Sequence, residues 1–251
     1  MIANFHTHTS RCNHASGTDR EYVEAAIRAG VKVLGFSDHS PYWFPNGYYS
    51  THRMKPNEIE EYVNSVLSLK KEYQNDIRIY LGFEAEYYPL YFDKMLEMIK
   101  PYPYEYLILG QHYLNNELDH VVSRTLSGKG LLKAYVSQVL EGLKTGDFLY
   151  LAHPDLASFQ FPEEEIEREY TRLCEGAKDM KIPLEINLLG IREKKHYPNA
   201  RFFEIAAKMG NEIILGIDAH EPKVLCDKNA ERIALEMVKA LNLKLITTPI
   251  L

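Results

Sequence analysis

The sequence has little of what marks secreted, membrane-spanning or nucleic-acid-binding proteins. Its three cysteines, Cys12, Cys174 and Cys226, are odd in number and far apart, which does not fit a disulfide framework. The sequence has no apolar run of about 18 residues, the length that a transmembrane helix needs. Its first residues lack the basic segment and the apolar stretch of a secretion signal. The formal net charge of -6 argues against general nucleic-acid binding. We therefore expect a cytoplasmic protein with neither a membrane nor a general nucleic-acid partner.

The chain also lacks a linker rich in proline, glycine or serine, so we expect a single domain over residues 1–251. Short apolar runs alternate instead with segments of helical spacing, of which the clearest are 19–30, 56–73 and 162–180. The runs expected to form strands are 2–8, 31–39, 77–86, 106–112, 148–155, 182–187 and 212–220.

Alternating strands and helices form either a parallel barrel or a doubly wound open sheet. Every expected strand ends in polar or charged residues. In a barrel these ends converge on one mouth, whereas the outer strands of an open sheet would deliver their residues too far from the middle to cooperate. The pattern therefore predicts an α/β fold, a seven-stranded variant of the TIM-like barrel, with its active site at the C-terminal ends of the strands.

Most of the ten histidines lie at these strand ends or just beyond them. His6 and His8 are two residues apart on a strand, so their side chains share a face and can chelate one ion. Burying many ionisable groups together is costly without a cation, whereas divalent metals make such a cluster favourable. The sequence therefore predicts a metal site formed by His6, His8, His14, His39, His112, His153 and His220.

Carboxylates and an amide accompany the histidines with the same spacing of two residues. The pairs are Glu84 with Glu86, Glu185 with Asn187, and Asp218 with His220. A mixture of imidazole and carboxylate ligands suits zinc, manganese or iron and does not choose among them. Closely spaced metals would lower the pKa of a shared water and would hold phosphate oxygens, which favours phosphate ester hydrolysis.

An ordered series of motifs runs along nearly the whole chain. The motifs are HTHT from His6, SDHS around Asp38, GFEAEYY around Glu84, GQHY around His112, AHPD around His153, EINLLGIR from Glu185 and GIDAH ending at His220. Together they resemble the PHP superfamily, and most closely its histidinol-phosphatase branch. The resemblance implies a distorted (β/α)7 barrel that holds three divalent ions, which are zinc, manganese or iron.

The resemblance also implies how the ligands are shared among the metals. It assigns His6, His8, Glu84 and Asp218 to the first metal, with Glu84 bridging to a second metal that His112 and His153 bind. It assigns His14, His39 and His220 to the third metal. The implied reaction is hydrolysis of a small phosphate monoester, L-histidinol phosphate foremost, by a metal-bound hydroxide. The residues expected to carry the catalysis are Asp38, His39, Glu84, Asp218 and His220. Asp38 is expected chiefly to orient a ligand, and the alternative is that it protonates the leaving group.

Arg192 is the expected phosphate contact, because its planar guanidinium suits bidentate binding and because the resemblance places an arginine in this loop. Glu185 and Asn187 are expected to hydrogen-bond to the ligands or to the substrate. One departure from the family pattern is that residues 155–161 include no basic residue, where histidinol phosphatases usually supply another arginine. This departure leaves open another phosphomonoester, or a phosphodiester or nucleotide, as the substrate.

Other classes of protein fit the sequence less well. A noncatalytic relative should have lost ligands, and a metal-dependent amide hydrolase should carry a lysine at a strand end. The aromatic segment 40–56 is long enough to be a lid, or it packs over the barrel rim. Glu86 is either a partner of a ligand or a helix-start residue. His52, His120 and His196 lie in polar segments and are expected at the surface.

Overall fold

The sheet of the protein contains eight parallel strands that pair in chain order. The computed structural model describes residues 1–157 and 160–249, so that Ser158 and Phe159 of the arginine-free segment lie outside the described residues. The strands are β1 (Ala3–Asn4), β2 (Val33–His39), β3 (Arg78–Ala85), β4 (Tyr106–Leu109), β5 (Phe148–Leu151), β6 (Leu184–Asn187), β7 (Glu212–Gly216) and β8 (Lys244–Leu245). All seven predicted strands are present, and only the two-residue β8 was not predicted.

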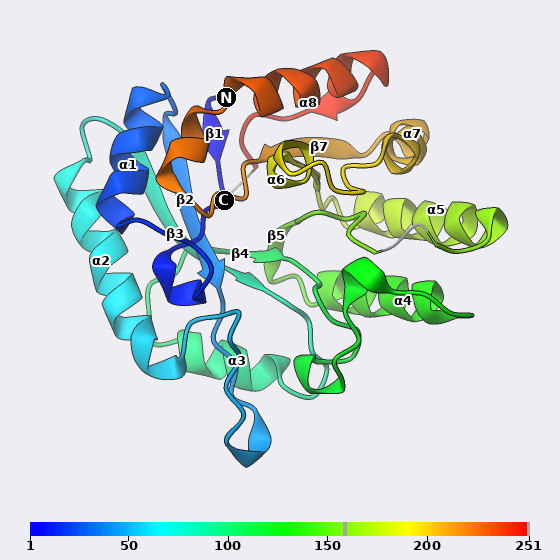
Figure 1. The fold of residues 1–251 in the computed structure, drawn as a ribbon, viewed down its shortest axis with the longest axis horizontal. Coiled ribbons are helices and arrows are strands. Elements are labelled where there is room, and N and C mark those ends of the chain that lie inside the picture. Colours follow the sequence, from blue (N-terminus) through cyan, green and yellow to red (C-terminus); the bar gives the residue numbers. More distant parts are fainter. Residues whose placement is uncertain (158–159, 250–251) are drawn as a thin grey trace.

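Helices surround the curled sheet, as Figure 1 shows. The three helices predicted from spacing correspond to α1, α2 and α5, and each begins within three residues of the predicted start. The helices are α1 (Asp19–Arg28), α2 (Ile59–Glu72), α3 (Phe92–Ile99), α4 (Leu131–Lys144), α5 (Glu163–Asp179), α6 (Leu188–Arg192), α7 (Ala200–Met209) and α8 (Lys228–Ala240). In the described part of the chain, none of them is long and apolar enough to cross a membrane.

The first and seventh strands meet at the C-terminal end of the sheet. An isolated parallel bridge joins Thr7, beyond the end of β1, to Ala219, beyond the end of β7. At the opposite end, β8 pairs with the first residues of β7, Glu212 and Ile213. The mouth is therefore closed by seven strands, and β8 fills only the other end. This arrangement confirms the predicted distorted (β/α)7 barrel.

Two apolar layers flank the sheet. The larger layer lies between the strands and the helices, and it includes Leu81 and Phe83 of β3. The smaller layer fills the inside of the barrel with Ala3, Phe5, Tyr106, Ile108, Tyr150, Ala152 and Ile214. Because side chains alternate along a strand, Glu84 follows Phe83 onto the inner side. Polar ligands can therefore gather above an apolar plug, at one end of the barrel.

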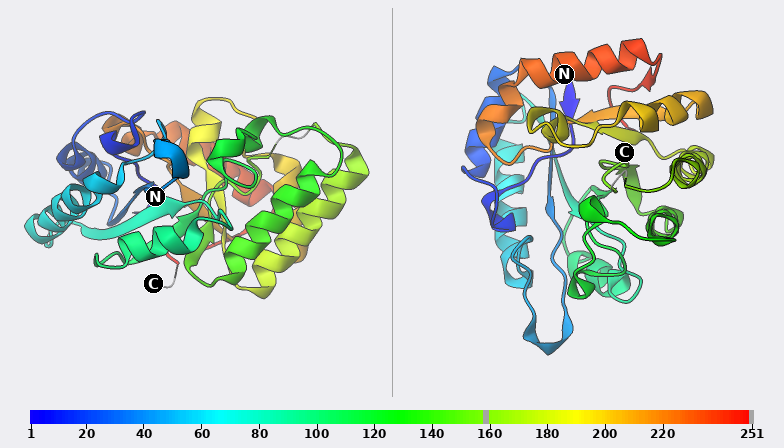
Figure 2. Two further views of the ribbon diagram at one scale, coloured as in Figure 1. Left: turned by 90° about the horizontal axis from the view of Figure 1, so that it is seen from below. Right: turned by 45° about the vertical axis from the view of Figure 1, so that its right-hand side comes forward.

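The aromatic segment 40–56 extends from the end of β2 as an arm that projects from the body of the molecule (Figures 1 and 2). Two of its rings pack on the segment between β3 and α3, where the rings of Tyr42 and Tyr88 are 4.9 Å apart and those of Phe44 and Tyr91 are 5.3 Å apart. Near its tip lies a short 3-10 turn, Pro45–Gly47. Of the two predicted roles, packing at the rim is the one that the structure shows.

Candidate metal centre

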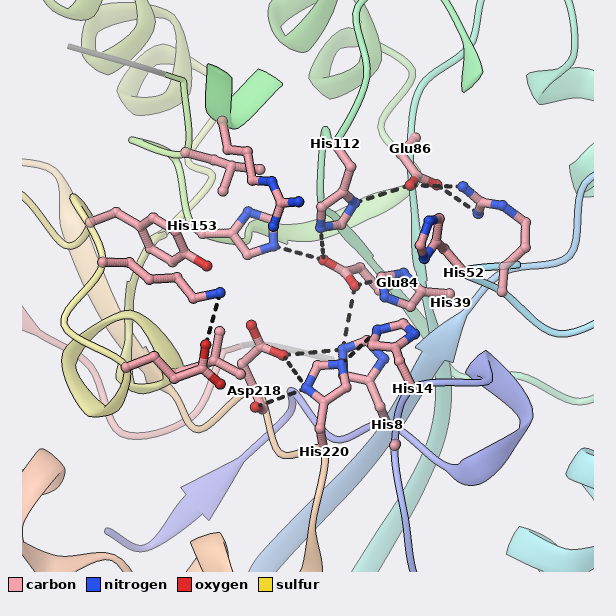
Figure 3. A pocket seen from close by; sticks show the side chains of 18 of the residues that line it. His8, His14, His39, His52, Glu84, Glu86, His112, His153, Asp218 and His220 are labelled. Atoms are coloured by element: carbon pink, nitrogen blue, oxygen red, sulfur yellow. Dashed lines mark hydrogen bonds and ion pairs between the residues drawn. The ribbon is translucent and has the colours of Figure 1, made fainter. Parts of the chain in front are cut away.

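The strand ends bring the predicted ligands to one mouth (Figure 3). They line a cavity of about 760 Å³, whose wall includes His8, His14, His39, Glu84, His112, His153, Asp218 and His220. His6 lies beneath this wall and is fully buried. All nine residues predicted as metal ligands are thus in one cluster. Their positions range from residue 6 to residue 220, so the barrel alone makes them neighbours.

Glu84 lies at the centre of the cluster, with its two carboxylate oxygens facing different histidines. Oε1 is 2.9 Å from Nε2 of His153, 3.5 Å from Nε2 of His6 and 3.7 Å from Nε2 of His112. Oε2 is 3.0 Å from Nδ1 of His39 and 3.4 Å from Nε2 of His8. A carboxylate placed in this way can contact two ions at once, as a bridging ligand does.

Asp218 makes a second junction on the opposite side of the mouth. Its Oδ1 lies 3.3 Å from Nε2 of His8, 3.6 Å from Nε2 of His6 and 3.3 Å from Nδ1 of His220. The other ring nitrogen of His220 is 3.0 Å from Nε2 of His14. This last pair joins two nitrogen atoms that ordinarily act as metal ligands, and the geometry therefore suits an ion shared by His14 and His220.

The backbone at the strand ends is shaped to aim these side chains inward. His153 and Asp218 both have positive φ angles, 28° and 51°, which L residues adopt rarely and mostly where function requires it. Gly110 and Gly216 leave room for the carboxylates, since a methyl group at either position would overlap Glu84 or Glu185. Glycine at these two strand ends is therefore required by the close approach of the Glu84 and Glu185 side chains.

Several ligand atoms are buried without a hydrogen-bond partner in the described part of the chain. Those that face the cluster are Nε2 of His6, Nδ1 of His39, Oε2 of Glu84 and Oδ1 of Asp218. Buried polar atoms without a partner are costly and few in native proteins. Divalent cations would satisfy such nitrogen and oxygen atoms together, so the residues present fit a metal centre of the predicted kind.

The electrostatics of the cluster also favour bound cations. Burial alone would lower the pKa of His8, but the carboxylates of Asp218 and Asp38 raise it to about 9. Burial and the neighbouring His8 lower the pKa of His220 to about 3. Burial would raise the pKa of Glu84, yet the surrounding histidines hold it well below its usual range. The histidines around Asp218 likewise hold its pKa well below its usual range, so Glu84 and Asp218 stay ionised and attract positive charge to the mouth.

Glu185 and Asn187 contact the ligands and do not line the cavity. Oε1 of Glu185 is 2.8 Å from Nδ1 of His6, and its Oε2 accepts hydrogen bonds from the backbone of His153 and from Asn187, both at 2.9 Å. Asn187 also donates to Oδ2 of Asp218 at 3.0 Å. Such contacts fix the orientation of metal ligands. Of the two roles predicted for this pair, the contact with ligands is the one found.

Asp38 also lies behind the ligands. Its carboxylate accepts a hydrogen bond from the hydroxyl of Thr9 and from the backbone of His39, and it lies 3.5 Å from Nδ1 of His8. The side chain is fully buried and is not part of the cavity wall. This position suits the predicted orienting role.

Glu86 contacts the ligand His112, whose Nδ1 is 3.0 Å from its Oε1. It is not a helix-start residue, because α3 begins at Phe92. Arg53 of the aromatic arm donates to both oxygens of Glu86 at 2.9 Å and to Glu117 at 3.0 Å. Arg53 was not predicted to matter, and no pattern in an irregular loop could have singled it out. The arm is thus linked through Glu86 to the predicted ligand His112.

Arg192, the predicted phosphate contact, lies at the end of the short helix α6. Its guanidinium donates to the carbonyl oxygens of Ile217 and Asp218 at 3.2 and 3.3 Å, and it is not part of the cavity wall. Two basic residues that the sequence did not single out, Arg124 and Lys195, do line the cavity. His52, His120 and His196 are exposed, as predicted, although His52 also reaches the cavity wall.

The fold and the histidine- and carboxylate-rich mouth together place the protein in the class of metal-binding β/α barrels. The PHP domain model matches residues 4–188, and the chain belongs to this family. The family resemblance predicted from the motifs is therefore confirmed.

Named relatives match over most of their length. A probable histidinol-phosphatase of Deinococcus radiodurans is 30% identical in an alignment of 234 positions that covers 88% of this chain and 87% of the relative. The histidinol-phosphatase of Bacillus subtilis is 24% identical in an alignment of 251 positions that covers 86% of this chain and 92% of the relative. Among solved structures, a histidinol phosphate phosphatase of Lactococcus lactis with zinc, L-histidinol and phosphate bound matches with a TM-score of 0.74. At 18% identity it covers 99% of this chain and 96% of its own, and it shows the same fold.

Proposed function

We propose that the protein is a metal-dependent phosphatase that hydrolyses a small phosphate monoester, with L-histidinol phosphate as its substrate. The observation that carries the proposal is the complete set of histidine and carboxylate ligands at one mouth, centred on the two oxygens of Glu84. The names of the relatives from Deinococcus and Bacillus support the choice of substrate. The cavity of about 760 Å³ is large enough for a metabolite of this size.

The proposed centre holds three divalent ions of zinc, manganese or iron. As the family resemblance implies, His6, His8, Glu84 and Asp218 would hold the first ion, Glu84 with His112 and His153 the second, and His14, His39 and His220 the third. In support of the first site, the ligand atoms of His6, His8 and Glu84 lie within 4.8 Å of one another. Bound ions of this kind supply Lewis acidity, which activates water and neutralises charge on phosphate.

The protein's own residues would fix the geometry of that centre. Glu185 orients His6 so that Nε2 faces the cluster, and Glu86 does the same for His112. Asp38, beneath the cavity wall, holds His8 through Nδ1. We propose that these three carboxylates position ligands and do not touch the substrate. His39 and His220 line the cavity and would contact the third ion.

The compartment and domain organisation complete the proposal. Cys12, Cys174 and Cys226 are all unpaired, which fits the reducing cytoplasm in which we propose that the protein works. We further propose that residues 1–251 form one barrel domain. The partner at the mouth is a small phosphorylated metabolite.

The test is a substrate screen with the metal-loaded protein. L-Histidinol phosphate, p-nitrophenyl phosphate and a bis-phosphodiester would be compared by kcat/KM. The proposal expects hydrolysis of both monoesters, with L-histidinol phosphate at least about tenfold ahead. Turnover of the diester at an equal rate would overturn the monoester assignment, and a preference for another phosphorylated metabolite would overturn histidinol phosphate alone.

A further inference from the structure

We propose that Arg124 is the phosphate-binding cation of this cavity and that it replaces the arginine missing after His153. The inference rests on the proposed phosphatase function and names a residue of the same site. It transfers the phosphate contact from Arg192, which the sequence indicated, to a residue on a different loop.

The first argument is where the chain places Arg124. After the ligand His112 the chain reverses, because Tyr113 and Val122 pair in an antiparallel bridge. The backbone N–H of Ser123 then donates to the carbonyl of His112 at 2.8 Å, and Ser123 itself is fully buried. Arg124, the next residue, is therefore anchored beside a metal ligand although it is twelve positions away in sequence, and it lines the cavity.

The second argument is that Arg124 is available to bind phosphate, whereas Arg53 and Lys195 in the cavity wall are paired with carboxylates. Arg53 is bound to Glu86 and Glu117, and Nζ of Lys195 lies 2.9 Å from Glu193. For Arg124, the structure gives neither a hydrogen bond nor an ion pair to any residue in 1–157 and 160–249. A guanidinium that is already paired must lose its partner to bind phosphate, whereas Arg124 needs no exchange.

The third argument is the position of Arg192. Its NH2 group donates to two backbone carbonyls at the end of β7, where it supports the turn that carries Asp218. Its Nη1 group is buried without a hydrogen-bond partner in the described part of the chain, and Arg192 is not part of the cavity wall. Arg124 stands instead on the wall shared with His112 and His153. Its planar fork offers the bidentate contact that phosphate accepts.

The experiment measures binding of inorganic phosphate to the metal-loaded protein by calorimetric titration, with metal content checked for each variant. Arg124→Ala should weaken phosphate binding about tenfold, since it removes one charge-assisted contact at an exposed site. The phosphate affinity of Arg124→Lys should lie between those of the wild type and Arg124→Ala, because lysine keeps the positive charge but lacks the planar guanidinium. Arg78→Ala, which removes an exposed arginine at the start of β3, is the matched control and should bind as the wild type does.

The Michaelis constants of the variants should change in the same order as their affinities for phosphate. Arg124→Ala should raise KM for p-nitrophenyl phosphate by a similar factor, with metal content unchanged. If Arg124→Ala binds phosphate like the wild type, or if only Arg192→Ala or Lys195→Ala weakens binding, the assignment is overturned while the phosphatase function stands. If the wild type hydrolyses no phosphomonoester, the proposed function fails instead, and phosphate binding still reports on Arg124.

Discussion

Thr7 and Ala219 form a parallel bridge that closes the barrel at its mouth. The backbone N–H of His8 donates to the carbonyl of Ala219 at 2.9 Å, and the N–H of Ala219 donates to the carbonyl of His6 at 3.2 Å. Each bridged residue lies between two predicted ligands, so the bridge sets the HTH and DAH motifs side by side. The rings of His8 and His220 consequently stack with their centroids 4.2 Å apart. The bridge that closes the barrel thus also brings together predicted ligands from the two ends of the chain.

Removal of the metal ions should abolish phosphatase activity and lower the melting temperature of the protein. Without cations the buried ligand atoms lose their partners, so the chelated protein should melt roughly 5–10 °C lower than the loaded protein. Manganese or zinc should restore both properties. Chelation should be easier at about pH 5.5 than at pH 7.5, because protons compete with metal for histidine nitrogens. Full activity after complete removal of metal, measured by elemental analysis, would rule out the proposed centre.

Glu185→Gln should weaken metal binding by roughly 10–100-fold while the fold is kept. Both oxygens of Glu185 accept hydrogen bonds, from His6, His153 and Asn187, so a glutamine must turn its NH2 group towards a donor. Competition with a coloured chelator measures the affinity. Glu60→Gln, an exposed residue of α2, is the control. Equal affinities for the two variants would mean that Glu185 does not orient His6.

Arg53→Ala should destabilise the protein by about 3–5 kcal/mol, as breaking a buried ion pair does. Arg53 is 3% exposed and lies between Glu86 and Glu117, which are each 1% exposed, so its loss removes the guanidinium that pairs with both buried carboxylates. Urea unfolding measures the change. Arg20→Ala, which removes an exposed arginine paired with Glu72, should have little effect. A loss no larger than that of the control would show that the arm is not held by this network.

One barrel domain should unfold in one cooperative transition. Closure between the segments after β1 and β7 joins the two halves of the chain, so neither half has a complete sheet alone. Near-ultraviolet circular dichroism and tyrosine fluorescence should therefore give coincident urea curves for the metal-free protein. Two separated transitions would argue for two independent units.

Most of the strands and helices could be predicted from the sequence because the local sequence patterns agree with one another. The seven apolar runs, the helices between them and the polar strand ends each follow from side-chain periodicity. The strand β8 escaped prediction because Lys244 and Leu245 are too short a stretch to show any period. In the same way, nothing local distinguishes Arg53 from any other loop arginine, because its partners Glu86 and Glu117 are 33 and 64 residues away.

The sequence by itself determined which residues could bind metal, since the imidazole and carboxylate groups and their spacing of two are local properties of the chain. It also determined the barrel, because all of its polar clusters follow strands. Only the tertiary structure decided which groups face the cavity and which stand behind it. It placed Glu185 and Asp38 beneath the ligands, and it held Arg192 against backbone carbonyls while Arg124 reached the wall. The physical reason is that such choices depend on loop reversals and on partners distant in sequence, which no local pattern records.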